Sequence, residues 1–137
     1  MPARLPHVAA ETVARRLELR PGTVTLDALK DIYTGLGEDA LTDGHSVLKV
    51  EAFAMAAAVQ ELIETPEPSG LAASARLIVT VDDLIVSAYE LRTDVAGAYD
   101  RFDKHTARAT EAVEILTAIG VKLEAADLEL RTGTRAA

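Results

Sequence analysis

The sequence predicts an all-α protein, a bundle of four to five helices that forms a homodimer. Apolar residues recur at helical spacing along most of the 137-residue chain, and alanine, the strongest helix former, is abundant. The helix expected between Leu71 and Leu91 is apolar around most of its circumference. Such a helix needs cover on several sides, either at the centre of the bundle or at an interface between two copies.

Five helices are expected along the chain, and glycine, proline or capping residues mark their ends. The expected helices cover residues 8–19, 25–36, 46–64, 71–91 and 93–119. The residues that mark their ends include Pro21 with Gly22, Gly35 with Gly37, Ser46, Pro66 with Pro68, Thr93 or Asp94, and Gly120.

The other segments complete one domain that spans residues 1–137. Its parts are a basic N-terminal helix and turn over 1–24, a polar loop over 38–44, a main three-helix core over 46–119 and a polar tail over 132–137. His45, just before the third helix, is expected to be a loop or N-cap residue. Residues 121–131 fit either a last helix or a short extended piece.

Composition excludes several classes of function. The chain has no cysteine, which rules out disulfides, a thiol nucleophile and a cysteine zinc site. A net charge of −8 argues against a general nucleic-acid or anionic-membrane binder. The longest nearly uncharged apolar stretch, Leu77 to Val81, is too short to span a membrane, and residues 1–10 do not resemble a signal peptide. We therefore expect a cytosolic protein.

Three ionisable residues interrupt the apolar faces of the three longest expected helices. At about 100° per residue, Glu51, Asp82 and His105 each fall among apolar neighbours on their own helix. An unpaired buried charge costs several kcal/mol, so each of these groups needs a partner.

One interpretation of these residues is a shared internal pocket that binds or turns over a small molecule. Glu51 and Asp82 would form an acid–base pair or bind a cation such as Mg²⁺ or Mn²⁺, and His105 would be the titrating partner. Tyr89 and Tyr99 would donate hydrogen bonds to the ligand. In the alternative, these residues are structural: the carboxylates pair with arginines such as Arg92 or Arg108, and His105 bonds a backbone carbonyl.

The stretch from Leu48 to Leu91 resembles the all-α nucleoside-triphosphate pyrophosphatases, the MazG-like group. That family holds magnesium with a Glu-x-x-Glu pair on one helix and a Glu-x-x-Asp pair on the next. Glu51 matches the first position and Asp82 the last, while Ala54 and Val79 stand where the other two ligands belong. The resemblance implies a dimeric helical fold and a nucleotide-related substrate, with half of the metal ligands missing.

Two further functions remain open. Glu11 to Val24 resembles the helix-turn-helix of bacterial repressors, and residues 1–30 carry a net charge of +2, which would suit DNA backbone contacts. That alternative expects an exposed, basic helix around Gly22 to Lys30. The other alternative is a non-catalytic oligomerisation or protein-interaction module, which expects arginine-paired carboxylates and no pocket.

Overall fold

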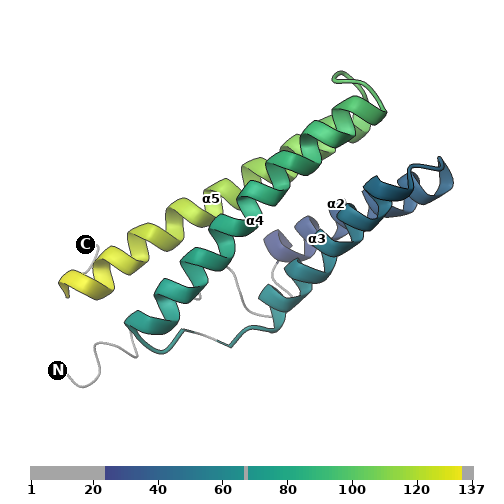
Figure 1. Ribbon diagram of the computed structural model, residues 1–137. Helices are drawn as coiled ribbons and strands as arrows, with labels where there is room; N and C mark the ends of the chain where they lie inside the picture. Colours follow the sequence, from purple (N-terminus) through teal and green to yellow (C-terminus); the bar gives the residue numbers. More distant parts are fainter. Residues whose placement is uncertain (1–23, 67, 134–137) are drawn as a thin grey trace.

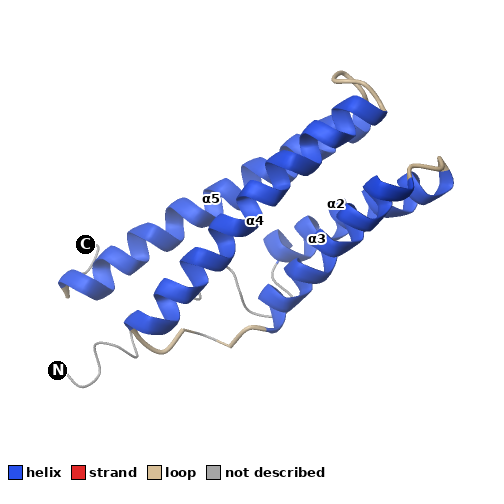
Figure 2. Cartoon of the chain, viewed as in Figure 1, coloured by secondary structure: helices blue, strands red, loops and turns tan. Residues whose placement is uncertain are grey.

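The protein is all-helical over the residues that its computed structural model describes, 24–66 and 68–133. Four helices follow one another in the chain (Figures 1 and 2). They are α2 (Val24–Thr42), α3 (Ser46–Glu64), α4 (Leu71–Ala98) and α5 (Lys104–Thr132). The expected all-α bundle is therefore confirmed, while the expected helix over 8–19 lies outside the described residues.

The bundle consists of two antiparallel helical hairpins. Contacts are densest between α2 and α3 and between α4 and α5, and they are sparser where α5 meets α2 and α3 meets α4. Figure 1 shows the α2–α3 turn and the α4–α5 loop at the same end of the molecule. Two polar connections, residues 43–45 and 99–103, therefore lie next to each other, although they are far apart in the sequence.

The second helix is longer than expected. Gly35 and Gly37 do not end α2, which continues to Thr42, so most of the expected polar loop over 38–44 is helical. Gly37 is buried, and a Cβ atom there would lie 2.6 Å from the ring of Phe53 on α3. The glycine therefore serves the close approach of two helices rather than the end of one.

The third helix has the expected bounds but a different cap. Its N-cap residue is His45, as expected for that histidine, and no side chain caps its first amides. Ser46 is the first helical residue, so the cap predicted for it is wrong. At the other end Thr65 follows α3, and its hydroxyl donates to the carbonyl of Glu61 at 2.6 Å.

The last two helices differ from the expectation at their shared boundary. Helix α4 begins at Leu71 as predicted but continues to Ala98, so Thr93 and Asp94 are interior residues and cap nothing. Helix α5 begins after Asp103, whose carboxylate accepts the backbone N–H of His105 at 2.7 Å. It passes through Gly120 without a break, and residues 121–131 are helical.

The core lies along the seam of all four helices. Leucines from every helix are fully buried there, among them Leu29, Leu62, Leu91 and Leu116. Helix α4 buries one stripe, and Leu71, Val79, Val86 and Tyr89 on its other sides are exposed. Among residues 24–66 and 68–133, helix α4 is thus covered on one side only. None of the described helices combines the length and hydropathy needed to cross a membrane.

One polar pair is buried within this core. Ser74, near the start of α4, donates from its hydroxyl to Oδ1 of Asp127 on α5 at 2.8 Å, and both residues are less than 5% exposed. The other oxygen of Asp127 accepts a hydrogen bond from Nε of Arg131 at 2.7 Å. Because every oxygen of the buried carboxylate has a partner, the pair fixes the register of α4 against α5.

Candidate functional site where the two hairpins meet

The structure brings three of the five expected site residues to one end of the bundle. Glu51, Tyr99 and His105 lie near the α2–α3 turn and the α4–α5 loop. Asp82 and Tyr89 do not join them. Asp82 is exposed, so the expectation that it points inward is wrong, and it lies about 18 Å before Asp94 along the axis of α4. Tyr89 is 44% exposed, with the guanidinium of Arg92 over its ring.

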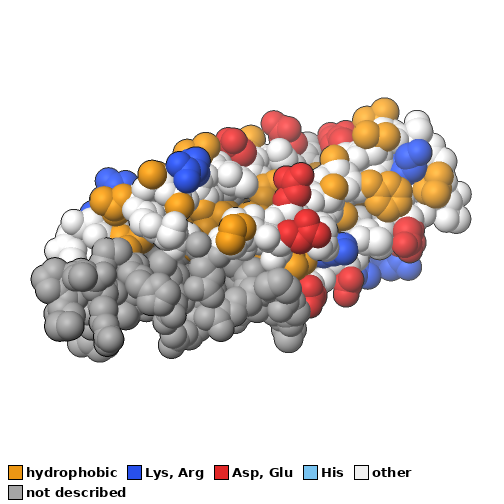
Figure 3. All heavy atoms as spheres, turned by 90° about the horizontal axis from the view of Figure 1, so that it is seen from below, with side chains coloured by type: hydrophobic (Ala, Val, Ile, Leu, Met, Phe, Trp, Pro, Cys, Tyr) orange, Lys and Arg blue, Asp and Glu red, His pale blue; other side chains and the backbone are white. Residues whose placement is uncertain are grey.

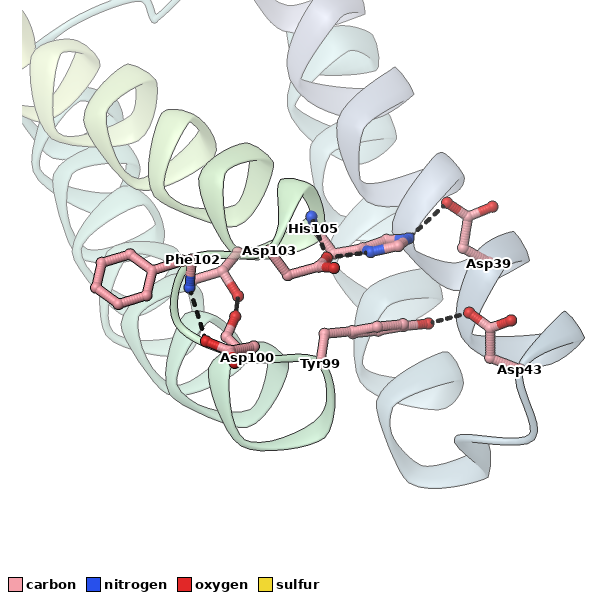
Figure 4. A network of polar contacts seen from close by, with 8 residues as sticks. Asp39, Asp43, Tyr99, Asp100, Phe102, Asp103 and His105 are labelled. Atoms are coloured by element: carbon pink, nitrogen blue, oxygen red, sulfur yellow. Dashed lines mark hydrogen bonds and ion pairs between the residues drawn. The ribbon is translucent and has the colours of Figure 1, made fainter.

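His105 connects α5 to α2 through two carboxylates. Its Nε2 lies 3.0 Å from Oδ2 of Asp39 on α2, and its Nδ1 contacts Oδ1 of Asp103 (Figure 4). A doubly protonated imidazole donates from both nitrogens and satisfies both carboxylates, whereas a neutral ring has only one donor. His105 is buried as expected, but its partners are carboxylates and not a backbone carbonyl.

Asp103 makes two contacts with His105. It caps α5 by accepting the backbone N–H of His105, and it also contacts the ring of the same histidine. These two interactions hold the pKa of Asp103 below its usual value. The carboxylate is therefore ionised at neutral pH, which is the state that both contacts require.

Tyr99 contacts two histidines. Its ring stacks on that of His105 with the centroids 4.0 Å apart, and it makes a T-shaped contact with the ring of His45 at a centroid distance of 4.9 Å. The hydroxyl of Tyr99 donates to Oδ2 of Asp43 at 2.8 Å, as Figure 4 shows. Burial, followed by the nearby carboxylates, raises the pKa of Tyr99 to about 12, so the hydroxyl remains a donor at neutral pH.

The α4–α5 loop is held by its own hydrogen bonds. Asp100 has a backbone φ of 140°, a conformation that side-chain-bearing residues rarely adopt. Its carboxylate accepts the N–H of Phe102, and its carbonyl accepts the hydroxyl of Thr106. These bonds offset the strain and fix the loop that carries Asp103 and leads into His105.

A pair of carboxylates from two helices lies beside this network. Glu51 on α3 and Asp94 on α4 line the same cleft. Hydrogen bonding to Asp94, together with partial burial and the charges of Asp94 and Glu90, raises the pKa of Glu51 from 4.5 to about 7. A carboxyl group with a pKa near 7 has both an acid and a base form at neutral pH.

The two carboxylates line a cleft of about 510 Å³. The beginning of α3 contributes residues 45–48 and Glu51, and the end of α4 contributes Thr93, Asp94, Gly97 and Ala98. No lysine or arginine is among these lining residues. Since His45 lines the cleft and also contacts Tyr99, the carboxylate pair and the His105 network meet at this residue.

Sequence reasoning missed the acidic partners of this site. Asp39 and Asp43 were assigned to a loop, and Asp94 was assigned to a cap. Glu51 was expected to pair with Asp82 or with an arginine, and its partner is Asp94. Arg108 is exposed on α5. The sequence held one signal for this partner. Asp94 lies four residues after Glu90, so the two carboxylates share a face if α4 continues two turns beyond Leu91.

The described part of the chain holds no group of three or more metal-ligating side chains, and it includes only the end of the segment that resembles a DNA-binding motif. Among residues 24–66 and 68–133, no three His, Asp or Glu side chains form a group that could hold a metal ion. Residues 11–23 of the repressor-like segment lie outside the described residues. In the part from Val24 to Lys30, Leu26 and Leu29 are buried, and the ammonium of Lys30 donates to Gln60 at 2.6 Å.

Comparisons with other proteins add no family to this description. No protein-family model, no curated protein and no solved structure matches the chain. Its function is therefore argued from its own residues.

The raised pKa of Glu51 predicts an unusual dependence of stability on pH. A folded-state pKa of about 7 against 4.5 means that folding favours protonated Glu51, so this contribution is complete below pH 4.5 and lost as the pH rises through about 7. We expect Glu51→Gln to remove this loss and to be more stable than the parent at pH 8, by at most about 1 kcal/mol because solvent screens the pair.

Urea unfolding at several pH values between 4.5 and 8 measures this effect. Glu61→Gln, which changes an exposed carboxylate of the same helix outside the pair, is the matched control and should follow the parent. Parallel curves for Glu51→Gln and the parent would show that folding does not raise the pKa of Glu51.

Tyr99 allows its hydroxyl and its ring to be tested separately. Because the hydroxyl bonds an exposed carboxylate, Tyr99→Phe should cost less than about 1 kcal/mol of unfolding free energy. Tyr99→Ala also loses the stacking on His105 and the edge contact with His45, so it should cost at least about 1 kcal/mol more. Equal losses in urea unfolding would mean that the ring contacts contribute nothing.

Proposed function

We propose that this protein binds a small organic cation, a primary amine with a short apolar chain, in the cleft between Glu51 and Asp94. The observation that carries this proposal is the pairing of two carboxylates from separate helices in one open cleft, without a lysine or arginine in its lining. A protonated amine would donate to both carboxylates. This corrects the expected Glu51–Asp82 pair and keeps the expected small-molecule function.

The rest of the lining supports the choice of an amine with an apolar chain. Val47, Leu48 and Ala98 offer apolar surface, while Ser46 and Thr93 offer hydroxyls. A bound amine is favoured when Glu51 is ionised, so its affinity should increase as the pH rises through about 7. A divalent cation would bind this cleft less tightly, because carboxylate sites for such ions use more than two ligands.

The test compares three probes of similar size and different charge: butylamine, butanol and butyrate. Backbone NMR shifts of the parent chain should respond to butylamine at residues 45–51 and 93–98, more strongly at pH 8 than at pH 6. Glu51→Gln and Asp94→Asn should each weaken this binding about fivefold or more, which corresponds to about 1 kcal/mol. Glu61→Gln should leave it unchanged. Equal responses to butylamine and butyrate would refute the proposal.

A second candidate function is self-association along α4. Leu71, Val79, Val86 and Tyr89 are each more than 40% exposed and recur at helical spacing on the sides of α4 away from the core. Exposed apolar stripes of this kind are typical of surfaces that bind another protein, and a second copy would supply an equivalent stripe. This supports the homodimer expected from the sequence.

Sedimentation measures the association directly. The parent should form dimers at micromolar concentration, and Val86→Lys should be monomeric. Asp82, an exposed carboxylate among these apolar residues, should oppose burial, so Asp82→Ala should dimerise more tightly. A parent chain that is monomeric at all concentrations would exclude this function and leave the amine proposal unaffected.

A further inference from the structure

The chain joins the two hairpins at one end of the bundle only. The connection from α3 to α4 lies at the opposite end from the α2–α3 turn and the α4–α5 loop (Figure 1). Contacts between the hairpins are also sparser than contacts within them. The end that carries the candidate site is therefore held together by non-covalent interactions alone.

Two of these interactions depend on a proton that is lost as the pH rises. Nε2 of His105 on α5 lies 3.0 Å from Oδ2 of Asp39 on α2, and Glu51 on α3 lines one cleft with Asp94 on α4. Each pair joins a helix of one hairpin to a helix of the other. The hydroxyl of Tyr99, which also crosses between the hairpins, keeps its proton because its pKa is raised to about 12.

Loss of the two protons weakens both pairs. A neutral imidazole has one donor for two carboxylates, so the contact with Asp39 loses either its hydrogen bond or its charge assistance. Histidine is the side chain that ordinarily changes charge between pH 5 and 8. When Glu51 ionises as the pH rises through about 7, it faces Asp94 in a cleft without a lining lysine or arginine, and like charges repel.

The surroundings of both pairs are mainly acidic. The titratable groups around His105 and its stacked partner Tyr99 are Asp39, Asp43, His45 and Asp103, with Lys104 near Asp103; around Glu51 they are Asp94 and Glu90. The whole chain has a net charge of −8, and Figure 3 shows one face on which acidic side chains gather. Two further negative charges therefore favour separation of the hairpins at this end.

The core beside these pairs buries little apolar area. Ala40 follows Asp39, Ala52 follows Glu51 and Val95 follows Asp94, and all three are fully buried. Larger side chains, among them Leu26, Leu62, Leu77 and Leu123, fill the core toward the connected end. Since the hydrophobic contribution scales with buried apolar area, the end with small side chains separates at the lower cost.

We propose that the Asp39–His105 and Glu51–Asp94 pairs form a pH-operated clasp between the two hairpins. The clasp is closed when His105 and Glu51 are protonated, and it opens at this end when both have lost their protons. The proposal concerns how the hairpins are held together, so it does not require that the cleft bind an amine.

Spin labels test the proposal in the full chain, which has no cysteine of its own. Val50→Cys labels α3 and Ala107→Cys labels α5, both at exposed positions near the clasp. Double electron–electron resonance, without amine, should give a narrow distance distribution at pH 5.5. At pH 9 the mean should increase by at least about 3 Å, because water then separates the groups. Glu51→Gln with His105→Gln should give the same distribution at both pH values.

Controls separate the clasp from other effects of pH. His45→Gln, which changes the other described histidine at this end, should leave the increase intact. Labels at Glu61→Cys and Ala125→Cys, exposed positions toward the connected end, should report no change. Labelled chains are diluted with unlabelled ones so that each distance lies within one chain, and circular dichroism at both pH values confirms that the described helices remain folded.

Three outcomes would overturn the proposal. One is a parent distance that is equal at pH 5.5 and pH 9, a comparison that needs no substitution within the clasp. Another is an equal change for both label pairs, which would indicate general loosening. The last is an increase that persists in the folded double variant, which would assign it to other groups.

Discussion

Replacing Ser74 with alanine is expected to lower the free energy of unfolding by about 2–3 kcal/mol. The serine hydroxyl is the partner of Oδ1 of Asp127, and both side chains are almost fully buried. Its removal leaves one oxygen of a buried carboxylate without a hydrogen bond, while Arg131 still binds the other oxygen. Urea unfolding measures the loss, and the midpoint should fall without a change in slope.

A double variant tests whether this cost arises from the orphaned charge. Ser74→Ala combined with Asp127→Leu replaces the polar pair with apolar groups, so it should be more stable than Ser74→Ala alone. Asp127→Leu by itself should be destabilising, because the serine hydroxyl is then buried without an acceptor. Additive losses in this cycle would mean that the two residues act independently.

The second large effect is expected at Gly37. A methyl group at this position would lie 2.6 Å from two atoms of the Phe53 ring, so Gly37→Ala must displace that ring or separate α2 from α3. We expect a loss of about 1–3 kcal/mol, measured by thermal or urea unfolding. An unchanged stability would mean that Phe53 can move away at no cost.

Gly35, two residues earlier in α2, is the matched control. A Cβ atom there meets nothing within 4 Å, and the residue is helical. Gly35→Ala should therefore stabilise the protein by about 0.5–1 kcal/mol, because alanine loses less backbone entropy in a helix than glycine. The two substitutions are chemically identical, so the opposite signs isolate the contact with Phe53.

The comparison of these two glycines also explains why the sequence predicted the helices better than their ends. The apolar periodicity of residues 26–36, 48–63 and 71–91 located α2, α3 and most of α4. Glycine is a frequent helix terminator, but at Gly37 and Gly120 it is buried inside a helix against a side chain of a neighbouring helix. A sequence pattern reports the residue type and not the neighbour that requires it.

The candidate site was predictable only in part. The angular argument correctly found that His105 faces the core, because α5 has one apolar side. It failed for Asp82, because α4 has apolar residues on two sides and only one of them is buried in a single copy. Asp39 and Asp94 lie near the ends of α2 and α4, and Asp43 directly follows α2, all beyond the residues where the sequence predicted these helices to end.

The central claim is that the neighbouring Asp94 raises the pKa of Glu51 to near neutral pH. An NMR pH titration of the Glu51 side-chain carboxyl tests it most directly, in the parent and in Asp94→Asn. We expect the parent Glu51 to titrate near pH 7 and the variant value to move toward 4.5, because Asp94→Asn removes the neighbouring charge. A Glu51 that titrates near 4.5 in both proteins would contradict the account of this site.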